Sequence, residues 1–448
     1  MIFSSVLELV FLALLMVVSV QVSWWVSVWI CVVIAGIVVC VWYTSIGISS
    51  CGCGGVLVID EVSCGMVWLS VFISSLSLLS SGEVLAKKDS EMVFLVYILV
   101  LMDILVICFS VDSLLVFYVF FELSLIPTFL IICGWGYQPE RLRAGKFMVL
   151  YTVGASLPLL AFILCLMFGM GSVSLSFFGS CDKRMVSFFM FFMAVSAFLV
   201  KVPMYGLHVW LPKAHVEAPV AGSMMLAGVL LKLGGYGLAR FMPFFSVSNA
   251  FFFSCVICLC IFGGMVGSVI CCFQTDVKSL VAYSSVGHMS LVLCGFMSGS
   301  LLGFGGAYLL MVSHGLSSPG MFYLVSEMYK LFGSRSLFVI RGMMGNLMGV
   351  NLWLVFMCGF NAAAPPSLSI CSEVILYVSL MGYSWFFSVF LGGMSFLSCL
   401  YSWLLYCSTQ TGSYPNWVRS SKDVTYFYFH SVVCWSLGFP LIGLCMVV

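Results

Sequence analysis

Charge is what this sequence has least of. Asp, Glu, Lys and Arg make up 7% of its 448 residues, whereas 63% of the residues are hydrophobic. Soluble globular domains average about a quarter charged residues, so the composition excludes that class and predicts a polytopic membrane protein. The 17 basic and 16 acidic residues leave a formal net charge of +1, which excludes a nucleic-acid-binding protein built on a basic surface.

Sequence signatures of redox and hydrolytic chemistry are also missing. The chain has no CxxCH haem motif, no GxSxG elbow, no P-loop and no Cys/His set with metal-ligand spacing. Most of its 21 cysteines lie inside apolar runs, as Cys271 and Cys272 do, where a free thiol packs as a small hydrophobe. Cys51 and Cys53 lie in a Gly/Ser-rich loop, and a disulfide or metal there is only weakly indicated. We therefore expect no redox centre, cofactor or metal on this chain.

Long apolar runs fill the chain, and they are cut at polar or Gly/Pro-rich points. A span needs about 20 apolar residues, and that rule yields about fourteen candidate spans. The sequence thus predicts an all-α membrane fold. The expected spans are 6–22, 24–46, 56–80, 92–111, 113–133, 144–170, 186–210, 217–242, 250–273, 277–298, 301–330, 345–382, 384–407 and 427–447.

Basic residues alternate between the loops in a way that predicts topology. Loops after odd-numbered spans hold most of them, and loops after even-numbered spans hold only Lys183, Arg184 and Arg240. By the positive-inside rule the odd loops face the cytoplasm, or the matrix of an organelle. The residues assigned to the odd loops are Lys87, Lys88, Arg141, Arg143, Lys146, Lys278, Lys330, Arg335, Arg341, Arg419 and Lys422.

Prolines predict that the seventh and twelfth spans are broken. Lys201-Val-Pro203 interrupts one and Asn361-Ala-Ala-Ala-Pro365-Pro366 the other, because proline removes a helical hydrogen bond. The two breaks lie five spans apart, which suggests an inverted five-helix repeat, and matched broken helices point to a transport site. We expect Ser313–Gly320 to interrupt the eleventh span as well. The predicted divisions are 1–90, 91–245 (first repeat), 246–410 (second repeat) and 411–448.

Ionisable residues inside apolar spans are the candidates for function. A charge within a bilayer is costly unless it is paired or lines a wet cavity, and histidine titrates near neutrality, which suits a proton relay. Glu122 and Lys201 are expected to pair. The set comprises Glu122, Lys201, His208, Lys232, His288, His314 and Glu373.

Structural roles are an alternative to these functional roles. Glu122 and Lys201 could be a static ion pair that fixes helix register, and His208 an interfacial anchor. His215 and Glu217 fall in a short turn and could cap or join helices. Three acidic residues are expected at span ends, Asp103 and Asp112 as interfacial or cap residues and Asp276 as an N-cap beside Lys278.

Several sequence blocks resemble the proton-conducting, antiporter-like subunits of respiratory complex I, and most narrowly the chain 4 family of NADH-ubiquinone oxidoreductases. Together with the run from Lys201 to Arg240 they follow the family's order and spacing over roughly 90–410. The other blocks are FELSLIPTFLIICGWGYQPERLRAG at 121–145, QTDVKSLVAYSSVGHMS at 274–290, SHGLSSPGMF at 313–322 and NAAAPPSLSICSE at 361–373.

The resemblance implies roles for individual residues. Glu122 and Lys201 take the place of the family's coupling pair, and Lys232 that of its central proton carrier. His288 and His314 fall at relay positions, and Glu373 at the exit-side position, where glutamate is typical of chain 4 and lysine of the sister chains 2 and 5. Pro319 departs from the family pattern, which more often has a small or apolar residue there.

The resemblance also implies partners and a location. Neighbouring antiporter-like chains 2 and 5 and membrane lipids such as cardiolipin are the expected partners, with FMN, iron–sulfur clusters and ubiquinone in other subunits. The expected location is the mitochondrial inner membrane. A subunit of a multi-subunit sodium/proton antiporter, which shares the module, is the alternative.

Overall fold

The computed structural model describes residues 51–53 and 57–413, with gaps at 54–56, 88–89, 171–173, 175–187, 243–244, 246–249, 346–347 and 366, and a few residues of 24–36. Three predicted spans, 6–22, most of 24–46, and 427–447, lie outside the described residues. The chain divides into two compact units. Unit 1 holds 1–201 and 217–249, and unit 2 holds 202–216 and 250–448.

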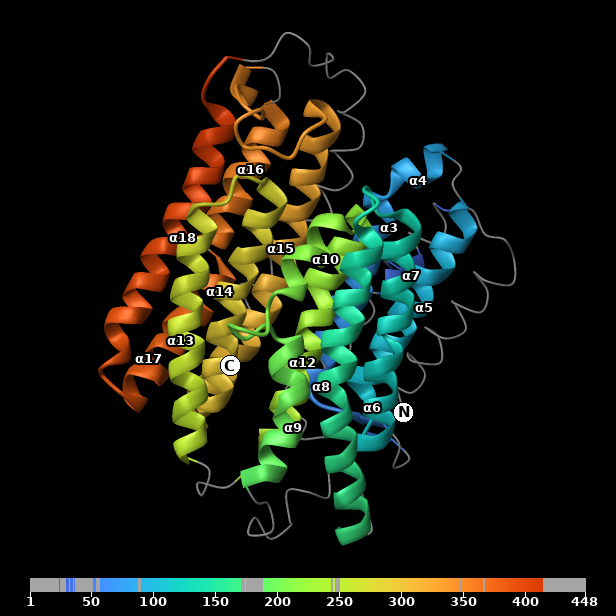
Figure 1. Ribbon diagram of the computed structural model, residues 1–448, viewed down its shortest axis with the longest axis vertical. Helices are drawn as coiled ribbons and strands as arrows, with labels where there is room; N and C mark the ends of the chain where they lie inside the picture. The colour runs from blue at the N-terminus through green and yellow to red at the C-terminus, as the bar shows by residue number, and fades with distance from the viewer. Residues whose placement is uncertain are drawn as a thin grey trace. The chain divides into compact units, whose positions relative to one another are not determined.

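Unit 1 is a bundle of apolar helices (Figure 1). Within it α3 packs on α5 and α11, α8 on α9, and α9 on α12. Two three-residue strands, β1 (Cys51–Cys53) and β2 (Leu57–Ile59), pair antiparallel before the first long helix. The helices are α3 (Glu61–Ser80), α4 (Gly82–Lys87), α5 (Glu91–Ser110), α6 (Leu114–Leu123), α7 (Leu125–Trp135), α8 (Arg141–Met170), α9 (Phe188–Lys201), α11 (Val220–Met225), η3 (Leu226–Leu230) and α12 (Leu231–Phe241).

Unit 2 is a second helical bundle, drawn from yellow to red in Figure 1 except for its green segment 202–216. In it α14 packs between α13 and α15, α18 packs on α13 and α16, and α17 packs on α15. Its helices are α10 (Trp210–Glu217, whose last residue belongs to unit 1), α13 (Ala250–Cys272), α14 (Val277–Met297), α15 (Leu301–Phe332), η6 (Met343–Gly345), α16 (Met348–Asn361), α17 (Leu368–Tyr383) and α18 (Phe387–Gln410).

Helix length and hydropathy confirm the predicted all-α membrane fold. Eight helices of the described residues are long and apolar enough to cross a membrane. Large apolar side chains point outward, with Leu150 71% and Phe168 90% exposed on α8, as expected where the solvent is lipid. The count of about fourteen spans, the inverted repeat and the domain boundaries stay predictions.

The two proline-marked breaks are present. Helix α9 ends at Lys201 and α10 begins at Trp210, while α16 ends at Asn361 and α17 begins at Leu368. Each break contains a residue in the left-handed backbone region, Gly206 at φ +93° and Ala363 at φ +53°.

The expected interruption of the eleventh span is wrong. Helix α15 runs unbroken from Leu301 to Phe332 with Pro319 inside it. Proline is tolerated in membrane helices when nearby hydroxyls and packed neighbours satisfy the backbone. The Ser318 hydroxyl donates to the carbonyl of His314 at 2.7 Å, and α14, α16 and α17 all pack on this helix.

Candidate functional site

Lys201 is the last residue of α9, and its ammonium group is enclosed within unit 1. Its side chain is 3% exposed. Nζ donates to the carbonyl of Phe121 at 3.0 Å and to the hydroxyl of Ser124 at 3.5 Å, and lies 3.4 Å from the centre of the Phe121 ring. Carbonyl, hydroxyl and aromatic face together replace part of the water that a buried ammonium loses.

Glu122 follows Phe121 on α6, so it shares a turn with the groups that hold Lys201. The two charges interact electrostatically, but in the described part of the chain Lys201 bonds to Phe121 and Ser124 rather than directly to Glu122. Glu122 Oε1 is buried and makes no hydrogen bond. The structure thus places the expected pair in one neighbourhood without a direct ion pair.

Lys232 lies fully buried (0% exposed) at the start of α12. The turn before it, Leu226–Leu230, is a π-helix, a widened turn that often marks a functional site. Its Nζ donates to the carbonyl of Ala227, five residues back, at 2.5 Å. The widened turn therefore supplies a backbone oxygen to the buried ammonium.

Beyond Lys232, the rest of α12 packs into an aromatic cluster. The Tyr236 ring lies edge-on to Phe109 at 5.1 Å, and its hydroxyl donates to the Phe109 carbonyl at 2.8 Å. A Cβ atom at Gly237 would lie 2.2 Å from the Phe198 ring, so the absence of a side chain there permits the close approach of α9. One turn further, Arg240 forms an ion pair with Asp60.

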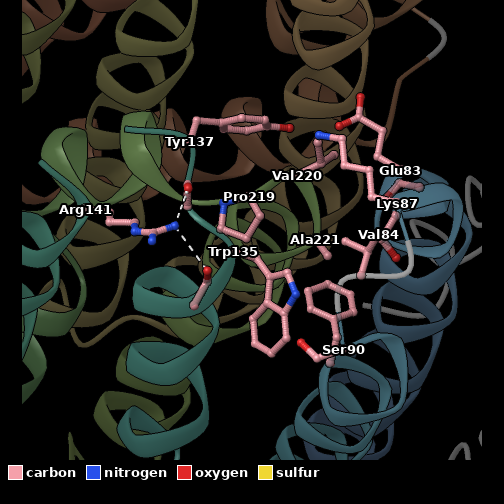
Figure 2. A pocket seen from close by; sticks show the side chains of 15 residues that line it. Glu83, Val84, Lys87, Ser90, Trp135, Tyr137, Arg141, Pro219, Val220 and Ala221 are labelled. Carbon is pink, nitrogen blue, oxygen red and sulfur yellow. Dashed lines mark hydrogen bonds between the residues drawn. The ribbon is translucent and has the colours of Figure 1, made fainter. Parts of the chain in front are cut away.

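A cavity of about 420 Å³ opens at the other end of unit 1 (Figure 2). It lies where α3 and α7 end and where α8 and α11 begin. Arg141 on its wall donates from one guanidinium nitrogen to the carbonyls of Gly134 and Gly136, at 3.1 and 2.8 Å. Its polar lining includes Ser80, Ser81, Glu83, Lys87, Ser90 and Tyr137. The charge distribution of the loops predicts that this mouth faces the cytoplasm, or the matrix of an organelle.

Three of the predicted site residues meet in the core of unit 2. His288 on α14 and Glu373 on α17 are 5% exposed each, and His288 Nδ1 lies 3.4 Å from Glu373 Oε1. The rings of His288 and His314 are 5.7 Å apart between centres, and His314 Nδ1 lies 3.4 Å from the Ser318 hydroxyl. The arrangement can hold a proton and pass it among neighbouring side chains.

His208 lies in the break before α10, also in unit 2. Its ring stacks on Tyr205 at 5.2 Å and meets Tyr283 edge-on at 6.0 Å. Nδ1 accepts the backbone N–H of Gly206 at 3.2 Å, which fixes the turn. These contacts hold His208 within the break, and both its relay role and its interpretation as an interfacial anchor stay predictions.

Comparisons with known proteins agree on one family. A family model described as NADH:quinone oxidoreductase/Mrp antiporter, TM matches 111–400, and one described as NADH-ubiquinone oxidoreductase chain 4, amino terminus matches 2–108. The chain is 42% identical over 354 residues to NADH-ubiquinone oxidoreductase chain 4 of Ceratitis capitata, covering 79% of each chain. It belongs to the NADH-ubiquinone oxidoreductase chain 4 family.

Further relatives of that name come from other animals. The Mytilus edulis protein is 44% identical over 378 residues, covering 82% of this chain and 85% of its own. The Locusta migratoria protein is 39% identical over 391 residues, covering 87% and 86%. A chain of respiratory complex I from Thermus thermophilus with bound NADH matches at TM-score 0.83 and 22% identity, over 99% of this chain and 98% of that one; this likeness shows the fold.

Two cations that the sequence placed in loops, the buried Lys278 and the half-buried Arg335, contact the broken helix. Lys278, 2% exposed, and Arg335 both donate to the carbonyl of Val216, at 3.4 and 3.2 Å. That carbonyl lies in the last turn of α10, where a helix dipole attracts cations. Lys278 thus contacts the second half of the broken helix. Asp276 occupies the expected N-cap position of α14, and its side chain makes no cap hydrogen bond.

Other acidic and histidine residues also differ from expectation. Asp103 lies mid-helix in α5 instead of at its end, with Oδ1 buried and without a hydrogen bond. His215 and Glu217 lie in the last turn of α10 instead of the expected short turn. His215 stacks on Phe322 at 4.6 Å, and the carbonyl of Glu217 accepts the N–H of Tyr137.

The sequence analysis missed the side chains that complete the unit 2 site. Tyr401 on α18 and Tyr377 on α17 place their hydroxyls beside His288 and Glu373. Tyrosines in apolar helices resemble core residues, so no motif signalled them. In the part of the chain that the structure describes, no three His, Cys, Asp or Glu residues gather into a metal-binding group.

Proposed function

We infer that this chain is a proton-translocating subunit of the membrane arm of NADH:ubiquinone oxidoreductase. It moves protons across the membrane through buried lysine, glutamate and histidine residues, and electron transfer from NADH to ubiquinone in partner subunits drives the movement. Membership of the chain 4 family supports the assignment, and the buried ionisable groups of both units supply the chemistry.

The fully buried Lys232 is the observation that carries this function. A lysine at mid-span is expensive to keep charged, and the π-helical turn before it offers a carbonyl to the charged form. At ~4 Å and an effective dielectric of ~20, one ion pair is worth ~4 kcal/mol. Moving a charge across 100 mV costs ~2.3 kcal/mol. Forming or breaking one ion pair between buried groups, such as the contact of His288 with Glu373, is therefore enough to move a proton against a physiological field.

Six of the seven predicted residues take a part in this scheme, all except His208. Glu122 and Lys201 set the electrostatic field of unit 1, and Lys232 is its proton carrier. In unit 2 His288 and His314 relay protons, and Glu373 holds the exit-side position. The direct contact between His288 and Glu373 supports proton transfer between these two residues of unit 2. The position of Lys201 between the Phe121 carbonyl and the Ser124 hydroxyl supports a coupling through the turn that carries Glu122.

The setting follows from the family. We place the chain in the mitochondrial inner membrane beside antiporter-like chains 2 and 5, in contact with lipids such as cardiolipin, and place FMN, iron–sulfur clusters and ubiquinone in other subunits. Animal relatives named NADH-ubiquinone oxidoreductase chain 4 support this placement. The model that matches 111–400 also describes Mrp antiporters, which keeps a sodium/proton antiporter subunit as the second candidate, whereas the model that matches 2–108 names chain 4 alone.

Native gel electrophoresis of a mild-detergent membrane extract separates the two candidates. The gel is blotted for this chain and stained for NADH-dye reductase activity. Comigration with the reductase band is expected. Migration apart from NADH activity contradicts the assignment and favours the antiporter, whose assay is cation-dependent proton flux.

Replacing Lys232 with alanine tests the mechanism. The intact complex carrying Lys232→Ala is reconstituted in liposomes, and protons moved per NADH oxidised are measured with a pH-sensitive dye. We expect assembly to survive and pumping to fall. Lys146→Ala, which alters an exposed lysine on α8, is the matched control and leaves pumping unchanged. A fully coupled Lys232→Ala enzyme rules out Lys232 as the carrier.

A further inference from the structure

Helix α12 carries a line of polar side chains that continues beyond Lys232. Lys232, Tyr236 and Arg240 are spaced four residues apart, so they lie on one face of the helix. At 1.5 Å per residue the line covers about 12 Å of the helix axis. Lys232 and Tyr236 are buried, whereas the Arg240 side chain is 20% exposed. The line therefore runs from the buried ammonium group to the end of unit 1.

An ion pair lies at the exposed end of this line. Arg240 Nη1 donates to Asp60 Oδ2. Asp60 is the N-cap residue of α3, and Arg240 lies in the last turn of α12, positions where the helix dipoles stabilise an anion and a cation. The guanidinium carbon of Arg240 also lies 4.9 Å from the centre of the Tyr236 ring. Two helix ends and an aromatic ring thus hold the guanidinium group in place.

The groups that follow Lys232 on α12 are poor proton carriers. An arginine guanidinium group is not deprotonated in proteins, so Arg240 cannot take up a proton and release it. The Tyr236 hydroxyl donates to the carbonyl of Phe109 at 2.8 Å, and a carbonyl does not pass a proton onward. The rings of Phe109 and Phe117 lie 5.1 and 6.2 Å from the Tyr236 ring. Apolar rings and a fixed positive charge therefore separate Lys232 from this end of the unit.

The ion pair and the cavity of about 420 Å³ lie at opposite ends of unit 1. The cavity lies where α3 ends, and Asp60 lies where α3 begins. The loop charges predict that the cavity faces the cytoplasm or matrix, so the ion pair faces the opposite, outward side. Arginine side chains in membrane pores exclude protons and cations electrostatically. The position of Arg240 suits it to the same task.

We propose that Arg240 is a fixed electrostatic barrier that keeps a proton on Lys232 from leaving directly through the outward end of unit 1, and that Asp60 is the positioning residue that holds it there. The positive charge repels a proton that moves along α12, so the proton has to leave Lys232 by another route. The barrier thereby prevents a leak that would uncouple the pump. This inference rests on the proposed proton-translocating function.

Arg240→Gln in the intact complex tests the barrier. Glutamine can still donate a hydrogen bond to Asp60, but it carries no charge. Liposomes receive equal amounts of complex, matched by NADH-ferricyanide activity. A potassium diffusion potential is imposed without NADH, and a pH-sensitive dye reports proton entry. We expect the proton leak to rise several-fold, and protons pumped per NADH to fall while NADH oxidation continues. Arg240→Lys keeps the charge and should keep the leak at its normal rate.

Further variants separate a barrier from a purely structural ion pair. Arg141→Gln makes the same replacement at the opposite end of unit 1, where the guanidinium group bonds to two carbonyls, and should leave the leak unchanged. Adding Lys232→Ala to Arg240→Gln should abolish the extra leak, because the leak is expected to pass through Lys232. If Arg240→Gln does not assemble, Asp60→Ala releases the arginine from its position and should leak as well.

The outcomes distinguish this inference from the proposed function. The inference is overturned if neither Arg240→Gln nor Asp60→Ala leaks more than Arg141→Gln. It is also overturned if Arg240→Lys leaks as much as Arg240→Gln, or if the leak persists without Lys232. If Lys232→Ala lowers pumping while Arg240→Gln shows no extra leak, the proposed function stands without this barrier. If Lys232→Ala leaves the enzyme fully coupled, the proposed function itself fails.

Discussion

The two units hold their buried ionisable groups in different ways. In unit 1, Lys201 and Lys232 each donate to backbone carbonyls, those of Phe121 and Ala227. In unit 2, His288 and Glu373 contact each other directly, with tyrosine hydroxyls beside both. A carbonyl can accept a hydrogen bond but cannot carry a proton onward, whereas carboxylate, imidazole and phenol groups can exchange protons.

The difference suggests a division of labour. Unit 1 holds fixed positions where an ammonium charge is stabilised, and its helix α12 continues into the aromatic cluster around Tyr236. Unit 2 holds a connected chain of titratable side chains around a water-sized cavity. Apart from Lys232 and Arg240, the proposed carrier and barrier of unit 1, we therefore expect changes of chemistry to matter most in unit 2 and changes of packing to matter most in unit 1.

Glu373→Gln is expected to give the largest effect. It keeps the shape of the side chain but removes the proton acceptor beside His288. A positioned acid or base contributes roughly 10²–10⁴-fold to a proton transfer, so coupled NADH oxidation should fall by about tenfold or more. Turnover and protons pumped per NADH in liposomes measure it.

Glu327→Gln is the control for that change. Glu327 is also a buried glutamate in unit 2, 4% exposed, and it pairs with Lys330 at 2.6 Å, away from the cavity lining. Coupled turnover is expected to remain within about twofold, since glutamine keeps a side-chain oxygen that can accept from the partly exposed Lys330 ammonium. Equal losses in both variants would show that any buried carboxylate matters for stability and would remove the special place of Glu373.

Gly237→Ala probes packing in unit 1 and should have the next largest effect. The added Cβ would lie 2.2 Å from the Phe198 ring, and that ring is held by Phe121 and Phe241. Overpacking of this kind costs about 1–3 kcal/mol, so less assembled complex is expected on native gels. Gly154→Ala on α8 meets nothing within 4 Å and should assemble normally. Equal assembly of the two variants would refute a tight α9–α12 contact.

Gly206→Ala isolates the backbone of the first helix break. Gly206 adopts φ +93°, and a Cβ there meets nothing within 4 Å, so only the backbone conformation resists the change. A left-handed conformation costs a residue with a side chain about 1–2 kcal/mol. We expect a lower midpoint of thermal inactivation for the purified complex with unchanged turnover at low temperature. An unaltered midpoint would mean that the break relaxes into another conformation.

Sequence reasoning located the groups that carry charge, because charge is rare inside apolar spans. Lys201, Lys232 and Glu373 stand out on composition alone, and Pro203 and Pro365 mark the two breaks that the structure contains. These features are local in sequence. A charge or a proline inside an apolar span costs enough free energy that few other interpretations remain.

Features set by tertiary contacts were not predictable in the same way. The π-helical turn at Leu226–Leu230 has no composition that separates it from an α-helix. Tyr401 meets His288 across 113 residues, and Arg335 reaches the Val216 carbonyl across 119. Pro319 was expected to break the helix, because a local sequence pattern does not reveal the neighbouring helices that pack on α15.

Ala363→Gly in the second break should have the smallest effect. It should shift the midpoint of thermal inactivation in the direction opposite to Gly206→Ala. Ala363 adopts φ +53°, so glycine would relieve about 1–2 kcal/mol of left-handed strain. Glycine also gives the unfolded chain more freedom, which costs about 0.5–1 kcal/mol. The difference is a net stabilisation of about 0.5 kcal/mol or slightly more. The inactivation midpoint should therefore rise slightly, and a fall would show that the Ala363 methyl group makes packing contacts worth more than the strain it causes.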